Sequence, residues 1–589
     1  MSPRLILLPE GREIPCSEGE SLGEALTRAG IPISLYCGGR GACGKCLVEV
    51  ASGPVPEIDG RERRILEFRG LPESTRLACR LRVRDDLSIR IPPSSLVPSM
   101  PILVAGKQRP FAFNPALKKI AFGLRTAGPP SAGEVISVLR SLWPELETGS
   151  AADLPCLPEA PLHPSGEHVF TAVVYDDREL LDFEAGDTSA RIFGLAIDLG
   201  TTTLVVELVD LSSGRSLGTA AGLNGQASFG ADVVSRISAA FGNPGRLEEL
   251  RAAVIRSLNE LVRDLLGRQE VAPSEVVDAV LAGNTAMNHM FLGVSVDGLA
   301  VAPFEGAYLD HPALAARETG LVMNPRGRVS LVPNIGSFVG GDITAGLIAG
   351  GLEELTGRRL FIDLGTNGEI ALKNGERFAA TSTAAGPAFE GMTLSCGMLA
   401  LPGAVYKASA GRDGQLDVET VGGLPPKGIC GTGLIDLLAE ALAAGKVTTG
   451  GQVVDKSRRL PVAQGVSLTQ QDVRELQLAA AAVKTGIRMI LEDEGLTVAD
   501  LDEILVAGAF GTSLNSENAM KIGLLPRLEA GKLTVIGNAS LAGARAFLLS
   551  RSERRRGESL ARRVRHVALA KGGDFQSKFI EALEFKEWT

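Results

Sequence analysis

An Asp-Leu-Gly-Thr turn occurs twice in this chain, and its residue types suit chemistry on a phosphate group. The copies occupy residues 198–203 and 363–368, and each lies between two apolar runs. This pattern predicts a strand that ends near the aspartate, a tight turn and a second strand. The glycine lets the backbone approach a ligand closely, and the threonines supply hydroxyl and amide donors. Together with the carboxylate, these groups can hold a phosphate and its magnesium ion.

The recurrence of the turn changes its interpretation. One copy alone is equally well explained as a hairpin with Asp and Gly at its turn. Two copies predict a duplicated domain whose halves close on one nucleotide. The candidate contacts are Gly200, Thr201, Thr202 and Thr203 in the first copy, and Gly365, Thr366, Asn367 and Gly368 in the second.

Four of the eight cysteines are grouped, and their spacing is typical of a metal site. They follow the pattern Cys37-x5-Cys43-x2-Cys46-x32-Cys79, with three thiolates on one glycine-rich loop. This is a ligand set for a [2Fe–2S] cluster. Zinc is the rival metal, but a zinc ribbon usually has two Cys-x-x-Cys knuckles and this segment has one. The other cysteines, Cys16, Cys156, Cys396 and Cys430, are scattered, and we expect buried small apolar residues there.

Composition limits the class of protein. The chain has 589 residues, of which 45% are hydrophobic and 22% charged, so we expect several globular domains. The net charge of -9 and the 4% aromatic content argue against a nucleic-acid partner. No run of about 18 uncharged apolar residues occurs, so we expect no membrane span. So few cysteines in so long a chain are no disulfide framework, and we expect a cytoplasmic protein.

Local patterns divide the chain into segments. Residues 4–8 and 12–16 suit strands, and Ser21-x-x-Glu24 is a capping box that opens a short helix. Residues 132–142 have a helical pattern, and from 191 onward strands and helices alternate, which predicts sheets covered by helices. We therefore expect an iron–sulfur domain at 1–94, a linker at 95–130, a small α/β module at 131–190 that is a spacer or dimer contact, and a large α/β region at 191–589.

The two turns resemble phosphate loops one and two of the superfamily of acetate and sugar kinases, heat-shock protein 70 and actin. A third stretch, 504–511, resembles the adenosine loop of that superfamily, which implies that Gly508 and Gly511 lie near a purine ribose. The resemblance further implies that Asp198 and Asp363 are the catalytic carboxylates. They would hold magnesium, largely through water, and one would orient the attacking water. Hydrolysis then depends on positioning and charge stabilisation rather than on covalent chemistry.

Residues 3–94 resemble ferredoxins of the adrenodoxin type, including their β-grasp fold. With this module in front, the whole chain resembles the ATP-dependent reductive activators of corrinoid proteins. Further stretches carry that resemblance, namely 224–226, 230–237, 282–289, 333–335, 340–343, 381–391 and 428–433, the last with Gly431 and Gly433 as expected nucleotide contacts. The implied fold class is multidomain α+β and α/β: a β-grasp [2Fe–2S] ferredoxin, a small α/β middle module, and a duplicated, two-lobed ATPase of the actin and heat-shock-protein-70 type.

The resemblance implies that ATP hydrolysis drives the one-electron reduction of a corrinoid protein from Co(II) to Co(I). The implied cofactors are a [2Fe–2S] cluster, ATP and Mg²⁺. The implied partners are a corrinoid iron–sulfur protein or the corrinoid subunit of a methyltransferase, an upstream electron donor, and a second copy of the chain.

Some assignments stay open at this point. Ser382 is a candidate for an oxygen ligand that faces the corrinoid, and it could equally cap or line the nucleotide cleft. Two other functions remain as alternatives. One is an ATP-driven electron donor to another low-potential enzyme. The other is an ATP-binding iron–sulfur redox sensor or chaperone that donates no electrons.

Overall fold

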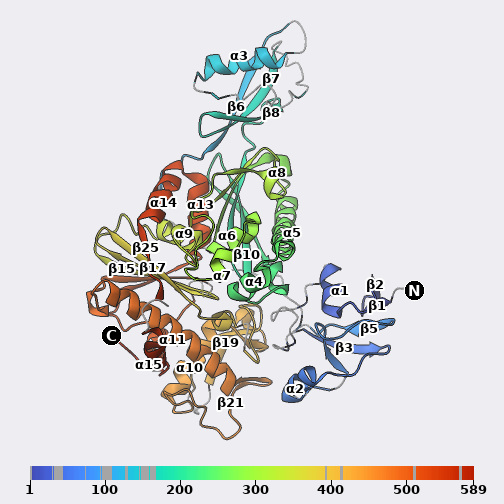
Figure 1. Ribbon diagram of the computed structural model, residues 1–589, viewed down its shortest axis with the longest axis vertical. Helices are drawn as coiled ribbons and strands as arrows, with labels where there is room; N and C mark the ends of the chain where they lie inside the picture. The colour runs from blue at the N-terminus through green and yellow to red at the C-terminus, as the bar shows by residue number, and fades with distance from the viewer. Residues whose placement is uncertain are drawn as a thin grey trace.

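The structure is a computed structural model that describes residues 3–589 except 30, 32, 34–40, 42–43, 45, 70, 73, 93–94, 96–108, 127–129, 145, 148–157, 159–166, 392–393, 412–415, 509–512 and 570–573. Figure 1 shows an N-terminal module in blue beside the body of the molecule, a small module that projects from the top, and two lobes that form the body. No helix in the described part of the chain is long and apolar enough to cross a bilayer.

The N-terminal module is a mixed sheet with the order β2-β1-β5-β3-β4. Its elements are β1 (Arg4–Leu8), β2 (Arg12–Pro15), α1 (Leu22–Arg28), β3 (Leu47–Ser52), α2 (Gly60–Arg69), β4 (Thr75–Leu77) and β5 (Leu87–Arg90). Strands β1 and β5 are parallel, whereas the other pairs are antiparallel. Helix α1 opens with the predicted capping box, because the Ser21 hydroxyl accepts from the Glu24 amide and the Glu24 carboxylate accepts from the Ser21 amide. This is the expected β-grasp module.

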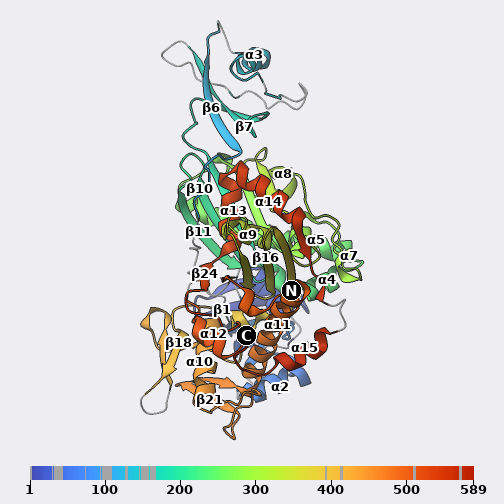
Figure 2. The same ribbon diagram turned by 90° about the vertical axis from the view of Figure 1, so that its left-hand side faces the viewer.

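The small module is an antiparallel sheet of β6 (Leu117–Leu124), β7 (His168–Tyr175) and β8 (Glu179–Ala185), with helix α3 (Ala132–Leu142) packed on it. Figure 2 shows that it stands clear of the lobes in a second view as well. Strand β6 corrects the expected linker at 95–130, since part of that segment belongs to this sheet. Two adjacent lysines interrupt the apolar pattern there, and the fully buried Lys119 is neutralised by Glu184, with 2.6 Å between the charged atoms.

The first lobe is a six-stranded sheet with the order β11-β10-β9-β12-β14-β13. The strands are β9 (Phe193–Leu199), β10 (Thr203–Asp210), β11 (Ser216–Leu223), β12 (Val276–Gly283), β13 (Leu314–Ala315) and β14 (Arg328–Leu331). Helices α4 (Val233–Ala240), α5 (Pro244–Arg268), α6 (Thr285–Leu292), α7 (Asp297–Ala300) and α8 (Ala316–Thr319) belong to this lobe, and α4 to α7 share one core with the sheet. Helix α5 is amphipathic, with Leu250, Val254 and Leu258 buried, and Asn243 caps its start by accepting from the Arg246 amide.

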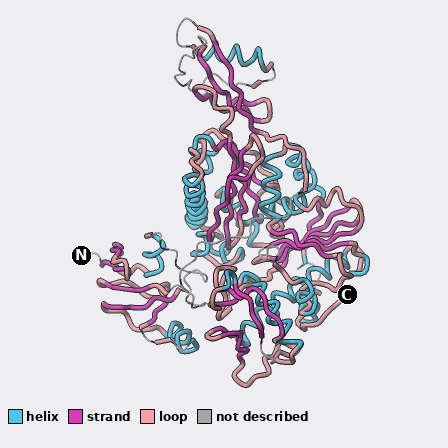
Figure 3. Tube along the Cα trace, turned by 180° about the vertical axis from the view of Figure 1, so that it is seen from behind, coloured by secondary structure: helices cyan, strands magenta, loops and turns pink. Residues whose placement is uncertain are grey.

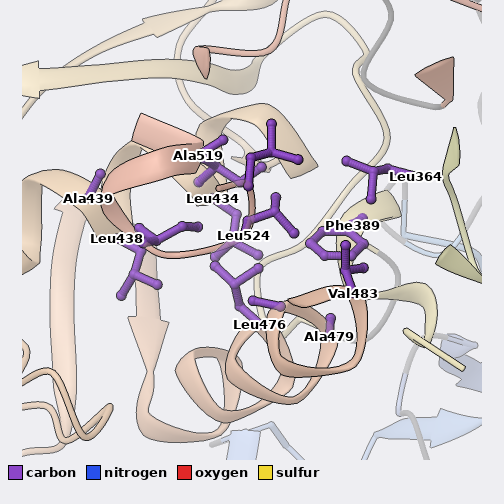
Figure 4. Packing of buried hydrophobic residues seen from close by; sticks show 14 of the residues in the cluster. Leu364, Phe389, Leu434, Leu438, Ala439, Leu476, Ala479, Val483, Ala519 and Leu524 are labelled. Atoms are coloured by element: carbon purple, nitrogen blue, oxygen red, sulfur yellow. The ribbon is translucent and has the colours of Figure 1, made fainter. Parts of the chain in front are cut away.

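The second lobe repeats this design with the strand order β24-β23-β15-β16-β17-β25. Its sheet strands are β15 (Arg358–Leu364), β16 (Gly368–Asn374), β17 (Arg377–Thr383), β23 (Glu503–Gly508), β24 (Leu533–Gly537) and β25 (Val564–His566). Around it lie β18 (Ala404–Ala410), β19 (Leu416–Thr420), β20 (Gly428–Ile429), β21 (Arg459–Ala463), β22 (Val466–Thr469), α10 (Gly431–Ala443), α11 (Gln470–Asp493), α12 (Ser516–Lys521) and α15 (Phe575–Ala582). Figure 4 shows Leu434 and Leu438 of α10 in one core with Leu476 and Val483 of α11, in which Val483 lies beside Phe389.

Two helices lie between the sheets of the two lobes. They are α9 (Gly341–Ala349) and α13 (Ala539–Leu549), and α14 (Arg551–Arg563) follows directly. One buried core contains residues from both sheets, such as Val280 and Phe361, together with Leu347 of α9 and Leu541 of α13. The two sheets, magenta in Figure 3, are thus joined through shared helices rather than through a loop alone.

Helices α9 and α13 touch backbone to backbone where they cross. A Cβ atom added at Gly543 would lie 2.1 Å from the carbonyl oxygen of Ala345. We expect Gly543→Ala to lower the free energy of unfolding by about 1–3 kcal/mol, because overpacking forces the helices apart. Gly267→Ala is the control, since its new Cβ meets nothing within 4 Å. Calorimetric melting checks both variants, and equal melting temperatures would contradict the close crossing.

Candidate functional site

A cavity of about 750 Å³ lies between the two lobes and collects both Asp-Leu-Gly-Thr turns. Carboxylates, hydroxyls and glycines line it together with apolar side chains such as Phe389, Leu399 and Val421. The predicted residues that line it are Asp198, Gly200, Thr201, Thr202, Thr203, Asp363, Gly365, Thr366, Asn367, Gly431 and Gly508. The predicted duplication therefore brings its two copies to one site.

The two turns are built alike. Asp198 lies one residue before the end of β9, which pairs antiparallel with β10 and parallel with β12. Asp363 has the same place in β15, which pairs antiparallel with β16 and parallel with β23. In the first turn glycine is required, because a Cβ at Gly200 would lie 2.3 Å from the carbonyl oxygen of Thr203. Both copies are thus the predicted strand, turn and strand.

Side chains connect the turns to each other and to a third segment. The hydroxyls of Thr202 and Thr366 lie 2.8 Å apart, so the two lobes meet by a hydrogen bond at the turns. Asn284 caps α6 by accepting from the Met287 amide, and it donates to the Thr201 hydroxyl over 2.9 Å. Asn284 also lines the cavity.

Four carboxylates face the cavity: Asp198, Asp342, Asp363 and Glu369. Burial raises the pKa of all four. The pKa of Asp342 reaches about 7, with Asp198 adding to the effect of burial, and that of Asp363 reaches about 8, with Asp342 and Asp198 adding. Such a group of buried acids favours a hard divalent cation with oxygen ligands, so the residues present fit Mg²⁺. Asp342 and Glu369 were not predicted as site residues.

The raised pKa of Asp363 predicts how metal-free stability depends on pH. This carboxyl has an ordinary pKa of 3.8 and one of about 8 in the fold. Between these values the folded protein holds a proton that the unfolded chain releases, so stability falls as the pH rises from about 4 to about 8. At about pH 8 without Mg²⁺ we expect Asp363→Asn to be more stable than the parent protein by at least about 1 kcal/mol. Melting in a chelator at several pH values checks this, and a variant of lower stability at the alkaline end would contradict it.

Two predicted nucleotide contacts, Gly368 and Gly433, have other places. An added Cβ at Gly368 would meet the Thr383 hydroxyl at 2.8 Å, and one at Gly433 would meet the Val405 carbonyl oxygen at 2.1 Å. These two glycines allow close packing with Thr383 and Val405 and are not among the residues that line the cavity. Gly511 lies outside the described residues, whereas Gly508 lines the cavity with a φ of +113°.

Ser382 lies on β17, directly opposite Glu369 of β16. Its hydroxyl donates to the Glu369 carboxylate over 3.4 Å, and Ser382 is not among the residues that line the cavity. Ser382 therefore contacts one of the four carboxylates but does not itself line the cavity. A contact between Ser382 and a corrinoid stays a prediction.

Of the four grouped cysteines, Cys46 and Cys79 are described, whereas Cys37 and Cys43 lie outside the described residues. Cys46 directly precedes β3 and Cys79 follows β4, and these strands pair at Leu47 and Leu77. The two sulfurs are buried and lie 3.4 Å apart. A disulfide has a bond of about 2.0 Å, whereas two thiolates at about 2.3 Å from one tetrahedral metal lie a little under 4 Å apart. The arrangement fits ligands that share a metal.

Three family models match the chain one after another. They are "2Fe-2S iron-sulfur cluster binding domain" at residues 5–84, "RACo middle region" at 193–355 and "C-terminal domain of RACo the ASKHA domain" at 358–588. Corrinoid activation enzyme RamQ of Eubacterium limosum is 32% identical over 97% of this chain and 96% of its own. The chain belongs to the family of corrinoid reductive activators. A solved structure titled "Reductive activator for corrinoid,iron-sulfur protein" superposes with a TM-score of 0.74 and 34% identity, covering 99% of this chain and 98% of that one.

A third relative of this activator supports the same family. The [Co(II) methylated amine-specific corrinoid protein] reductase of Methanosarcina barkeri is 26% identical over 68% of this chain and 77% of its own. The activator therefore carries a [2Fe–2S] cluster-binding domain and an ATPase domain of the expected superfamily. The family's middle region is the first lobe and not the small module of β6 to β8.

Proposed function

We propose that this activator reduces a corrinoid protein by one electron, from Co(II) to Co(I), and that ATP hydrolysis in the cleft between its lobes drives the transfer. The observation that carries the proposal is the presence of both parts in one chain: a [2Fe–2S] domain and a two-lobed ATP cleft. The relatives' activity on corrinoid proteins supports the choice of acceptor.

In the cleft, the turn hydroxyls and glycines bind the phosphates of ATP, and Asp198 and Asp363 hold its magnesium ion. Asp342 is the second residue of α9 and Asn538 precedes α13, so the helices that join the lobes start at this cavity. Phosphate release therefore changes the balance of charge where both lobes meet. Hydrolysis converts ATP and water to ADP, phosphate and a proton. The orientation of the two lobes relative to each other changes as a result.

The energetics require such a drive. A bound [2Fe–2S] cluster stores one electron, typically near about −400 mV in plant-type ferredoxins. Co(I) corrinoid is a stronger reductant, and each roughly 59 mV of deficit costs a factor of ten in the equilibrium of a one-electron transfer. We propose that Cys37, Cys43, Cys46 and Cys79 hold the cluster and that a separate donor protein supplies the electron.

The remaining partners are part of the same proposal. We infer that the activator works in the cytoplasm as a homodimer, with the projecting module of β6, β7 and β8 as the dimer contact. Its separation from the lobes supports this (Figure 1). Ser382 is the candidate that faces the corrinoid. If Ser382→Ala leaves the absorption spectrum of the bound corrinoid unchanged, that role is excluded.

The test is a reconstituted reaction. The activator with its cluster assembled is mixed with a corrinoid iron–sulfur protein and excess titanium(III) citrate, with or without MgATP. We expect the Co(I) absorption band to appear only with MgATP. If it fails to appear with this partner and with the corrinoid subunit of a methyltransferase, the proposed function is wrong.

A further inference from the structure

The carboxylate of Asp198 is held on both of its oxygens. The Asn538 amide nitrogen donates to Oδ2 and the Ser540 hydroxyl donates to Oδ1, each over 2.8 Å. In the described part of the chain, no hydrogen bond is made to the side chain of Asp363. The two catalytic aspartates are therefore fixed to different degrees, although their turns are alike.

The donors belong to a single helix start that is remote in sequence. Asn538 is the N-cap of α13, and its Oδ1 accepts from the Leu541 amide over 2.9 Å. Because the cap fixes Oδ1, the Nδ2 of the same amide is directed at Asp198. Both Asn538 and Ser540 also line the cavity, so they stand at the surface that a ligand would contact.

The helix that carries these donors is itself held in place. Gly543 of α13 lies against the backbone of Ala345 in α9, and Asp342 near the start of α9 faces the same cavity. The crossing of the helices thus sets the spacing between the Asn538–Ser540 pair and Asp342. The hydrogen-bond donors to Asp198 therefore come from the start of α13 and not from the turn that contains Asp198.

We propose that Asn538 and Ser540 are positioning residues for ATP hydrolysis, which fix the plane and the charge of the Asp198 carboxylate so that it meets the Mg²⁺–ATP complex in one orientation. Hydrogen bonds to an ionised acceptor are stronger than neutral ones, and held geometry is what phosphoryl transfer depends on. The inference rests on the proposed ATPase activity. It adds that α13, which packs between the lobes, connects the first phosphate turn to the core that the two lobes share.

Two kinds of substitution separate positioning from folding. Asn538→Asp keeps the helix cap, since Asp caps as well as Asn, but it turns a donor into an acceptor against Asp198. Ser540→Ala removes the second donor, and Ser540→Thr restores it. Asn243→Asp is the matched control, because it makes the same change at the N-cap of α5, away from the cavity.

The readouts are kcat and KM for ATP hydrolysis without a corrinoid protein, ATP affinity by calorimetry with Mg²⁺, and melting temperature. We expect kcat to fall about 100-fold in Asn538→Asp and about 10-fold in Ser540→Ala, as is typical for loss of catalytic geometry and of one charged hydrogen bond. Ser540→Thr should recover most of the activity, and all four variants should melt near the parent protein.

The outcomes separate this inference from the proposed function. If the parent protein hydrolyses ATP and Asn538→Asp matches Asn243→Asp in kcat and in ATP affinity, the positioning role is wrong. The role is also contradicted if the fall in kcat comes with a clear fall in melting temperature and Ser540→Thr does not restore kcat. If the parent hydrolyses ATP as expected but reduces no corrinoid protein, only the proposed function fails. A parent that binds no MgATP overturns both.

Discussion

We expect Asp363→Asn to abolish ATP turnover while the protein keeps its fold. The substitution preserves size but removes the charge that we propose holds magnesium at the second phosphate turn, and we expect phosphate release to fall by about 1000-fold or more. Asp198→Asn should have a similar effect. Because the side chain of Asp363 is buried among Asp198 and Asp342, the loss of activity comes with a gain in metal-free stability near about pH 8. Opposite signs for activity and stability distinguish a functional carboxylate from a structural one.

Phosphate release assays on the purified variants measure this effect. Asp264→Asn on α5 is the control, because its side chain is 60% exposed and pairs only with Arg268, one helical turn away, in the described part of the chain. If Asp363→Asn turns over ATP as fast as Asp264→Asn does, Asp363 has no role in hydrolysis.

We expect Cys79→Ala to prevent assembly of the iron–sulfur cluster but to leave ATP hydrolysis intact. Removal of one of the four proposed thiolate ligands would leave an iron without a ligand, whereas the ATP cleft lies in a separate part of the fold. We expect iron and sulfide contents near zero after reconstitution, loss of the visible absorption of the cluster, and no Co(I) formation. The rate of phosphate release should stay within about twofold of the parent, as for substitutions at distant, independent sites.

The control for this prediction lies in the same module. Cys16 is buried in the core of the β-grasp sheet and stands outside the spaced cysteine set, so Cys16→Ala should keep the cluster. Metal analysis also separates the rival metals. Zinc in place of iron and sulfide in the parent protein would contradict the [2Fe–2S] assignment.

The parts of the site that sequence reasoning could predict are local. An Asp-Leu-Gly-Thr turn carries its strands and its hydroxyls within a few residues, and the capping box at Ser21 and Glu24 is likewise complete in four positions. The cysteine spacing predicts a [2Fe–2S] domain, and the family model of such a domain matches residues 5–84. The turns and the capping box depend on neighbours in the chain, so no tertiary structure was needed to find them.

The parts that were missed depend on distant neighbours. Asn538 and Ser540 reach Asp198 from 340 and 342 residues away in the sequence. Glu369 has the appearance of an ordinary strand residue, yet the fold turns it toward the cavity beside Asp363. Strand β6 was not predicted because a lysine such as Lys119 is expected at the surface. In the fold its side chain is buried and is paired with Glu184. In each case the role of the polar residue is set by tertiary neighbours that are distant in the sequence or that the local pattern does not indicate.

The claim that ATP hydrolysis drives the electron is tested most directly in a single turnover. The activator with a reduced cluster is mixed in excess with a Co(II) corrinoid protein and MgATP, and phosphate release and Co(I) absorbance are followed together. The account predicts that both rise with one rate constant, and that both vanish in Asp363→Asn while the cluster stays reduced. Formation of Co(I) to the same extent without ATP, or at full rate in Asp363→Asn, would contradict it.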